Sequence, residues 1–124
     1  MRELISIGST LLGVDGNFNW IDTSGITDMR YLFFCMGNFN GHIELWDVSN
    51  VTIMKGMFWD ANSFNQDISK WDVSNVTNMY RMFYIAESFN QDISEWDVSN
   101  VKYNKEIFND CHINDEFKPK FNGE

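Results

Sequence analysis

Four aspartates recur at a constant spacing of 25 residues, and their carboxylates are the most regular charged groups of the chain: Asp22, Asp47, Asp72 and Asp97. On neighbouring parallel strands such carboxylates would lie about 5 Å apart and repel one another. One interpretation is local, because each carboxylate would accept hydrogen bonds from the backbone amides that follow it, in an Asx turn. The other is an acidic column on the sheet face that binds a cation or a basic partner. Both interpretations stay open.

Five aromatic residues form a second candidate surface, a stripe on the outward side of expected helices: Tyr31, Phe34, Trp59, Tyr80 and Tyr84. A helix turns by about 100° per residue, so Trp59 points toward solvent when Met57 and Phe58 face the core. Exposed aromatic side chains on one face suit a protein or sugar partner. The alternative is that each helix ends near Phe58 and that the next residue turns back beneath a loop.

Residues that carry catalysis or hold metals are sparse. The only neighbouring cysteine and histidine are Cys111 and His112, and adjacent residues on a chain rarely face one another, so they are a poor nucleophile and base. The segment from Asp60 to Phe64 opens like a calcium loop but lacks the glycine and the closing glutamate of such loops. Phosphate-binding loops, HExxH and CxxC are missing from the sequence. We therefore expect no catalytic residue, no cofactor and no metal site, and two free thiols.

The net charge of the chain is -9 at pH 7. A nucleic acid or an anionic membrane needs a basic surface, so neither is an expected partner. A basic protein partner fits this charge better. No apolar run approaches the length of a membrane span, and the first residues do not form a secretory signal.

A repeat positions both candidate surfaces. The string from Phe64 to Val76 recurs from Phe89 to Val101 with a single difference, Lys70 against Glu95, and tryptophans at 46, 71 and 96 mark the same period. A fixed period of 20–50 residues indicates stacked supersecondary units. We expect one domain over residues 1–124, with an N-terminal cap at 1–13, four coils at 14–113 of which the first and last are degenerate, and a C-terminal cap or tail at 114–124.

Within one copy the apolar spacing changes. Alternation around Trp71 predicts a short strand, Ser74 and Asn75 are placed to cap a helix, and a three-and-four spacing predicts an amphipathic helix with these inward residues: Val76, Met79, Met82, Phe83 and Ala86. The predicted fold is α/β, a short leucine-rich-repeat-like solenoid of about four 25-residue strand–helix coils. Its parallel sheet would form one face and its helices the other.

The string from Phe64 to Phe83, with its Trp-Asp-Val-Ser-Asn-Val centre, resembles a bacterial surface-protein repeat of about this length. That repeat occurs in mycoplasma-type lipoproteins and in surface proteins loosely called BspA-like, and the likeness covers residues 39–101, and 14–38 more weakly. The resemblance implies a leucine-rich-repeat-like fold, a secreted or surface-displayed location, and a binding module without catalysis.

The predicted function is a non-catalytic module that binds a protein or a glycan as part of a bacterial surface or secreted protein. The alternative is a small acidic intracellular inhibitor or immunity-type protein, cytoplasmic, that neutralises a basic target. A third hypothesis is self-association through the open ends of the stack. Salt separates the first two, because an acidic inhibitor loses affinity steeply as ionic strength rises and an aromatic patch does not.

Overall fold

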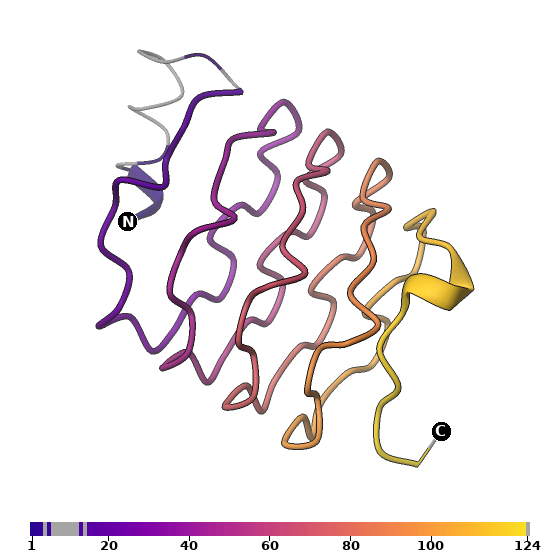
Figure 1. Ribbon diagram of the computed structural model, residues 1–124. Coiled ribbons are helices and arrows are strands. Elements are labelled where there is room, and N and C mark those ends of the chain that lie inside the picture. Colours follow the sequence, from indigo (N-terminus) through magenta and orange to yellow (C-terminus); the bar gives the residue numbers. More distant parts are fainter. Residues whose placement is uncertain (4, 6–12, 14, 124) are drawn as a thin grey trace.

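The computed structural model describes residues 1–3, 5, 13 and 15–123 of the chain. The chain winds through successive coils that lie side by side, from the indigo N-terminal end to the yellow C-terminal end (Figure 1). The hydrogen bonds keep the period of the sequence: the Thr77 amide donates to the Thr52 carbonyl, and the Thr52 amide to the Thr27 carbonyl, both at 2.8 Å. Most of the expected N-terminal cap at 1–13 lies outside the described residues.

The predicted α/β fold is wrong. Among the described residues the structure gives bounds for a single regular element, the 3-10 helix η1 at Asp115–Phe117. Parallel pairing is limited to isolated bridges, one linking Asn17 to His42 and a series that links Asp28, Ile53, Asn78 and Tyr103. The described residues therefore contain no parallel sheet and no layer of helices, and the expected leucine-rich-repeat-like solenoid is not what the chain forms.

The segment expected to be an amphipathic helix buries its apolar residues without forming a helix. The Met82 amide donates to the Met79 carbonyl, three residues back, at 3.1 Å, whereas the Phe83 amide donates to the Ile107 carbonyl of the next copy at 2.9 Å. An α-helix needs each amide to bond four residues back within the same segment. Here the amides alternate between turns inside a copy and bonds between copies.

Four equivalent segments share this pattern, and we call them the ladder segments: 29–35, 54–60, 79–85 and 104–110. In the first three, every second amide donates to a carbonyl 24 residues further along the chain, as from Tyr31 to Lys55 and from Phe33 to Met57. Each ladder segment also contains two residues with φ between 50° and 60°, at the positions of Tyr31 and Cys35. This left-handed backbone breaks both helix and strand geometry, which explains why neither forms.

Side chains join the copies where a strand was expected. The Trp71 amide closes a turn on the Ile68 carbonyl at 3.1 Å, and the indole Nε1 of Trp71 donates to the Ile43 carbonyl of the preceding copy at 3.2 Å. An asparagine ladder, which the sequence reasoning did not find, runs alongside: the Asn75 amide group donates to the Ser49 carbonyl at 2.7 Å, and its equivalents repeat this bond at Asn50, Asn100 and Asn122. These bonds replace the backbone pairing of a sheet.

The core is built from rows of aromatic rings. Phe33, Phe58 and Phe83 are fully buried, and their rings stack with centroids 5.2 and 5.3 Å apart. Phe108 extends the row at 5.7 Å. The rings of Trp71 and Trp96 stack at 6.5 Å beside it. Equivalent residues therefore pack on one another from copy to copy.

The C-terminal segment continues the stack over one half of the fourth copy. The Ile93 amide donates to the Phe117 carbonyl at 3.0 Å, and the Asn114 amide to Oδ1 of Asn90 at 2.9 Å. Phe121 is buried. Residues 113–122 thus lie where the first half of a further copy would lie.

Candidate functional site

Each aspartate of the acidic column closes a tight turn with the serine two residues further on. Oδ1 of Asp72 accepts a hydrogen bond from the Ser74 amide at 3.0 Å and another from the Ser74 hydroxyl at 2.6 Å. The same pair of bonds forms at the three other members of the column: Asp22, Asp47 and Asp97. The carboxylates are exposed, but their strongest contacts are local, which favours the Asx-turn interpretation.

The electrostatics of the column follow from these turns. The hydroxyl bond from Ser74, and then its amide bond, lower the pKa of Asp72 below its usual range, and the carboxylates of Asp97 and Asp47 act weakly in the opposite direction. The serine hydroxyl is also the leading cause of a lowered pKa at the three other aspartates: Asp22, Asp47 and Asp97. Hydrogen bonding therefore outweighs repulsion between neighbouring charges.

A second aspartate pair makes the same kind of turn and was missed from the sequence. Oδ1 of Asp67 accepts from the Ser69 amide at 3.0 Å, and Oδ1 of Asp92 accepts from the amide and hydroxyl of Ser94. The signal was present, since the spacing Asp-x-Ser occurs twice in the copy that starts at Phe64 and twice in the copy that starts at Phe89. Because the motif closes a turn at both positions, we interpret turn formation as its main role.

The aromatic residues meet on the surface, and we call this set the aromatic face: Tyr31, Phe34, Trp59, Tyr80 and Tyr84. The ring of Trp59 lies at the middle, with centroid distances of 5.4 Å to Phe34 and 5.3 Å to Tyr84, both edge-to-face. Tyr31 contacts Phe34 at 5.7 Å and Trp59 at 6.3 Å. All five side chains are half-buried. The ladder segments position these five side chains, because the residues of each segment that face away from the core lie in register from copy to copy.

Two cations complete the aromatic face, and the sequence reasoning did not identify them. The guanidinium of Arg81 lies 4.8 Å from the ring centroid of Trp59, 4.6 Å from Tyr84 and 5.2 Å from Tyr80. The ammonium of Lys55 lies 5.6 Å from the ring of Tyr80 and 5.8 Å from that of Tyr31. These cation–π contacts attach Tyr80 to the rest of the face.

Arg81 and Arg2 fix the ends of this surface. Nη2 of Arg81 pairs with Oε2 of Glu106 at 3.0 Å in the next copy. Arg2 donates to the backbone carbonyls of Tyr31 and Leu32 at 3.1 Å and to that of Phe34. The aromatic face is therefore held in one arrangement by the backbone and by ion pairing.

The thiols and histidines do not assemble into a reactive group in the described residues. Burial raises the pKa of the Cys111 thiol to about 11, and its Sγ lies 3.5 Å from the Phe89 carbonyl. Burial, followed by a hydrogen bond with Asp60, also raises the pKa of Cys35. A thiol that stays protonated is a weak nucleophile. Both cysteines are free, and the described residues include no cluster of three or more metal-binding side chains.

The structure thus describes a repeat protein whose copies stack in register and present an ordered aromatic face. The chain belongs to the family described as "Mycoplasma protein of unknown function, DUF285", which matches residues 8–120. Comparisons with curated proteins and with solved structures give no match. The mycoplasma part of the resemblance is therefore shown, whereas the leucine-rich-repeat part is overturned by the fold. Within the described residues, no helix has the length and apolar character needed to cross a bilayer.

Proposed function

We propose that this chain is a non-catalytic binding module, part of a bacterial surface or secreted protein of the BspA-like kind, and that it binds a protein partner through the aromatic face. The observation that carries the proposal is the continuous contact of Trp59 with Phe34, Tyr84 and Arg81 on the surface. Trp, Tyr and Arg are the residues that most often dominate the energy of protein interfaces. Aromatic side chains also lose little conformational entropy when they bind.

The rigidity of the face supports the same proposal. The ladder bonds fix the backbone beneath it, as from the Gly56 amide to the Tyr80 carbonyl at 2.9 Å. A surface that is already ordered pays less entropy when a partner binds. The acidic column is a weaker candidate for the binding surface, because its carboxylates already accept hydrogen bonds from the serines of their own turns: Ser24, Ser49, Ser74 and Ser99.

A capture experiment tests the proposal. The immobilised chain is incubated with a surface-protein extract from the organism's native setting, and captured proteins are quantified at low and high ionic strength. We expect Trp59→Ala to weaken capture by about 2 kcal/mol, roughly 30-fold, as for a central interface residue. Trp20→Ala is the matched control, because Trp20 is 62% exposed and lies outside the aromatic face. Capture by the control should equal that of the unchanged chain.

Two results would contradict the proposal. Capture that falls steeply with salt and is abolished by Asp72→Lys would favour the acidic inhibitor. Binding to a glycan array that depends on Trp59, with no captured protein, would favour the glycan alternative. The proposed surface location is tested separately: protease added to intact cells should remove the protein, whereas a cytoplasmic protein would be protected.

A further inference from the structure

The fourth ladder segment has a row of unused hydrogen-bond donors. In the three preceding segments the first, third, fifth and seventh amides donate to the next copy, as from Arg81 to Lys105 at 3.1 Å and from Ile85 to Asn109 at 2.9 Å. The equivalent amides of the fourth segment have no acceptor among the described residues: Asn104, Glu106, Phe108 and Asp110. We call this row the open edge.

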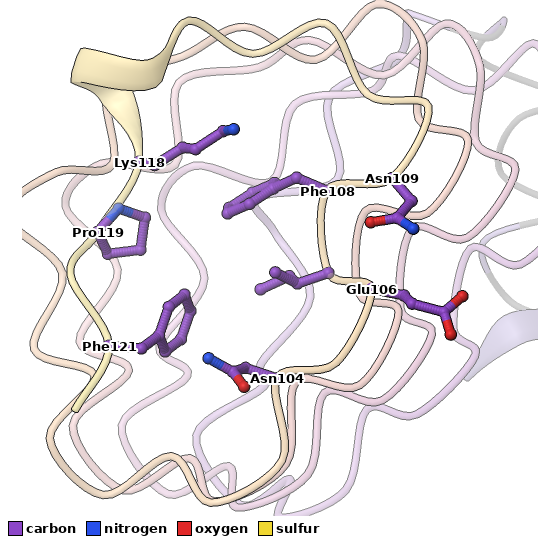
Figure 2. Close-up of a pocket in the computed structure, with 8 residues that line it drawn as sticks. Asn104, Glu106, Phe108, Asn109, Lys118, Pro119 and Phe121 are labelled. Carbon is purple, nitrogen blue, oxygen red and sulfur yellow. The ribbon is translucent and has the colours of Figure 1, made fainter. Parts of the chain in front are cut away.

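The C-terminal segment leaves the open edge uncovered. It covers the other half of the fourth copy, where the Asn122 amide group donates to the Ser99 carbonyl at 2.7 Å. Between the two lies a hollow of about 340 Å³. Figure 2 shows Phe108 and Asn104 on one side of it, facing Lys118, Pro119 and Phe121 on the other.

The charged groups that line the hollow already have partners. Glu106 pairs with Arg81 at 3.0 Å, and Lys118 pairs with Asp115 at 2.9 Å. The uncharged lining combines the side-chain amides of Asn104 and Asn109 with apolar side chains: Ile107, Phe108, Pro119 and Phe121. A ligand that adds to the open edge must therefore supply backbone acceptors, and the row of stacked rings that ends at Phe108 offers a place for one more aromatic side chain.

We propose that the open edge binds a short peptide segment of a partner protein that has the backbone of a ladder segment. The occupant presents carbonyls at every second residue to the four free amides and places Met or Phe side chains in the hollow. The internal interfaces carry this identification, because a segment of this kind occupies the same donor edge in each preceding copy, as 79–85 does on 54–60. The mode is strand-like addition to an exposed edge.

The geometry excludes a whole second copy of the chain as occupant. Its first half would have to occupy the level already taken by residues 113–122. The carbonyls of Leu32 and Phe34, which would meet the open edge, are already bound by Arg2. A single peptide segment meets neither obstacle, because it covers only the half of the fourth copy that residues 113–122 leave uncovered.

Hydrogen exchange followed by NMR tests the proposal, with a synthetic peptide of residues 77–86 of this chain as the probe. Without peptide, the amides of Asn104, Glu106 and Phe108 should exchange much faster than those of Arg81 and Phe83, which donate to carbonyls. Saturating peptide should slow the exchange of the open-edge amides by at least about tenfold. A peptide of the same composition in scrambled order is the control and should give no protection.

Variants locate the site. Phe108→Ala should weaken peptide binding roughly tenfold or more, because the incoming aromatic ring loses its stacking partner. Tyr103→Ala is the control, because that side chain is 61% exposed and does not line the hollow. Trp59→Ala should leave peptide binding unchanged, which separates this site from the aromatic face. Open-edge amides that are protected without peptide, that do not respond to it, or that respond equally to the scrambled peptide would overturn the proposal.

Discussion

At the scale of single residues, the backbone conformation of the ladder segments is the most demanding feature. Among the described residues, seven that are not glycine adopt positive φ, and all of them lie in ladder segments: Tyr31, Cys35, Asp60, Arg81, Ile85, Glu106 and Asp110. Each costs about 1–2 kcal/mol relative to ordinary backbone. Hydrogen bonds from neighbouring amides to the next copy offset this strain, as from the Phe83 amide to the Ile107 carbonyl. Gly56 holds the equivalent position in the ladder segment 54–60, with φ 60°, and a glycine adopts this conformation without the strain.

Gly56 also has no room for a side chain. A Cβ at this position would overlap the ring of Tyr31, and φ would remain in the left-handed region. We expect Gly56→Ala to lower the free energy of unfolding by about 2 kcal/mol or more, measured by urea denaturation.

Two controls separate strain from overlap. Gly25→Ala should change stability little, because no atom lies within 4 Å of its Cβ position and its φ is not positive. In a Tyr31→Ala chain the overlap is absent, so the further change Gly56→Ala should cost only the backbone strain, measured against Tyr31→Ala alone. A Gly56→Ala chain as stable as the unchanged one would show that the left-handed turn is not required.

At the scale of elements, turns replace the helix and strand that the apolar spacing predicted. The Asp-x-Ser turn at Asp72 encloses the buried Val73 and fixes the chain between the buried residues Trp71 and Val76. Its carboxylate must be ionised to accept both bonds from Ser74 well. The turns therefore make the stability of the chain depend on pH.

The sign of this dependence follows from the lowered pKa of Asp72. In the unfolded chain the carboxyl has an ordinary pKa of about 3.9. The stabilisation is therefore full above that value and is lost as pH falls through the lower pKa of the folded state. We expect the melting temperature of the unchanged chain to fall between neutral pH and about pH 2.

Asp72→Asn should reduce this acid sensitivity, because the amide does not titrate. The measurement is the difference in melting temperature between the two pH values for each chain. Asp15→Asn serves as the comparison, because Asp15 belongs to none of the Asp-x-Ser turns. An equal acid response in the unchanged and Asp72→Asn chains would mean that the turn carboxylate does not contribute.

At the scale of the whole molecule, every copy depends on its neighbours. The ladder bonds and the aromatic rows join one copy to the next, and the ladder segments form no helix or strand that would satisfy its own backbone. Such a chain has few local units that can form alone, so damage in a middle copy should spread to both sides.

Trp71 is the residue that tests this coupling. It is 4% exposed, stacks with Trp96 at 6.5 Å and donates to the Ile43 carbonyl. We expect Trp71→Ala to cost about 3–5 kcal/mol, much of the stability of a small domain. Trp20→Ala, at a residue 62% exposed, should cost less than about 0.5 kcal/mol by the same denaturation measurement. Similar losses for both would contradict the stacked core.

The period, the register and the inward residues can be read from the amino-acid sequence alone. Its repeats aligned Trp71 with Trp96, and its three-and-four spacing marked Met79, Met82 and Phe83, all of which are buried. These features follow from which side chains avoid water, and that information is local to each copy. The aspartate column and the aromatic stripe were also visible as recurring positions.

The backbone conformation and the partners of the surface groups depend on how the copies stack. The same apolar spacing fits an α-helix and a ladder segment, and the difference lies in whether the Phe83 amide bonds within its own copy or to Ile107 of the next. Local conformational propensity cannot predict which bond forms, because the competing acceptor, the Ile107 carbonyl, lies 24 residues further along the chain. For the same reason the contact of Arg81 with Trp59, and the free amides of the fourth ladder segment, became visible only when the copies were stacked.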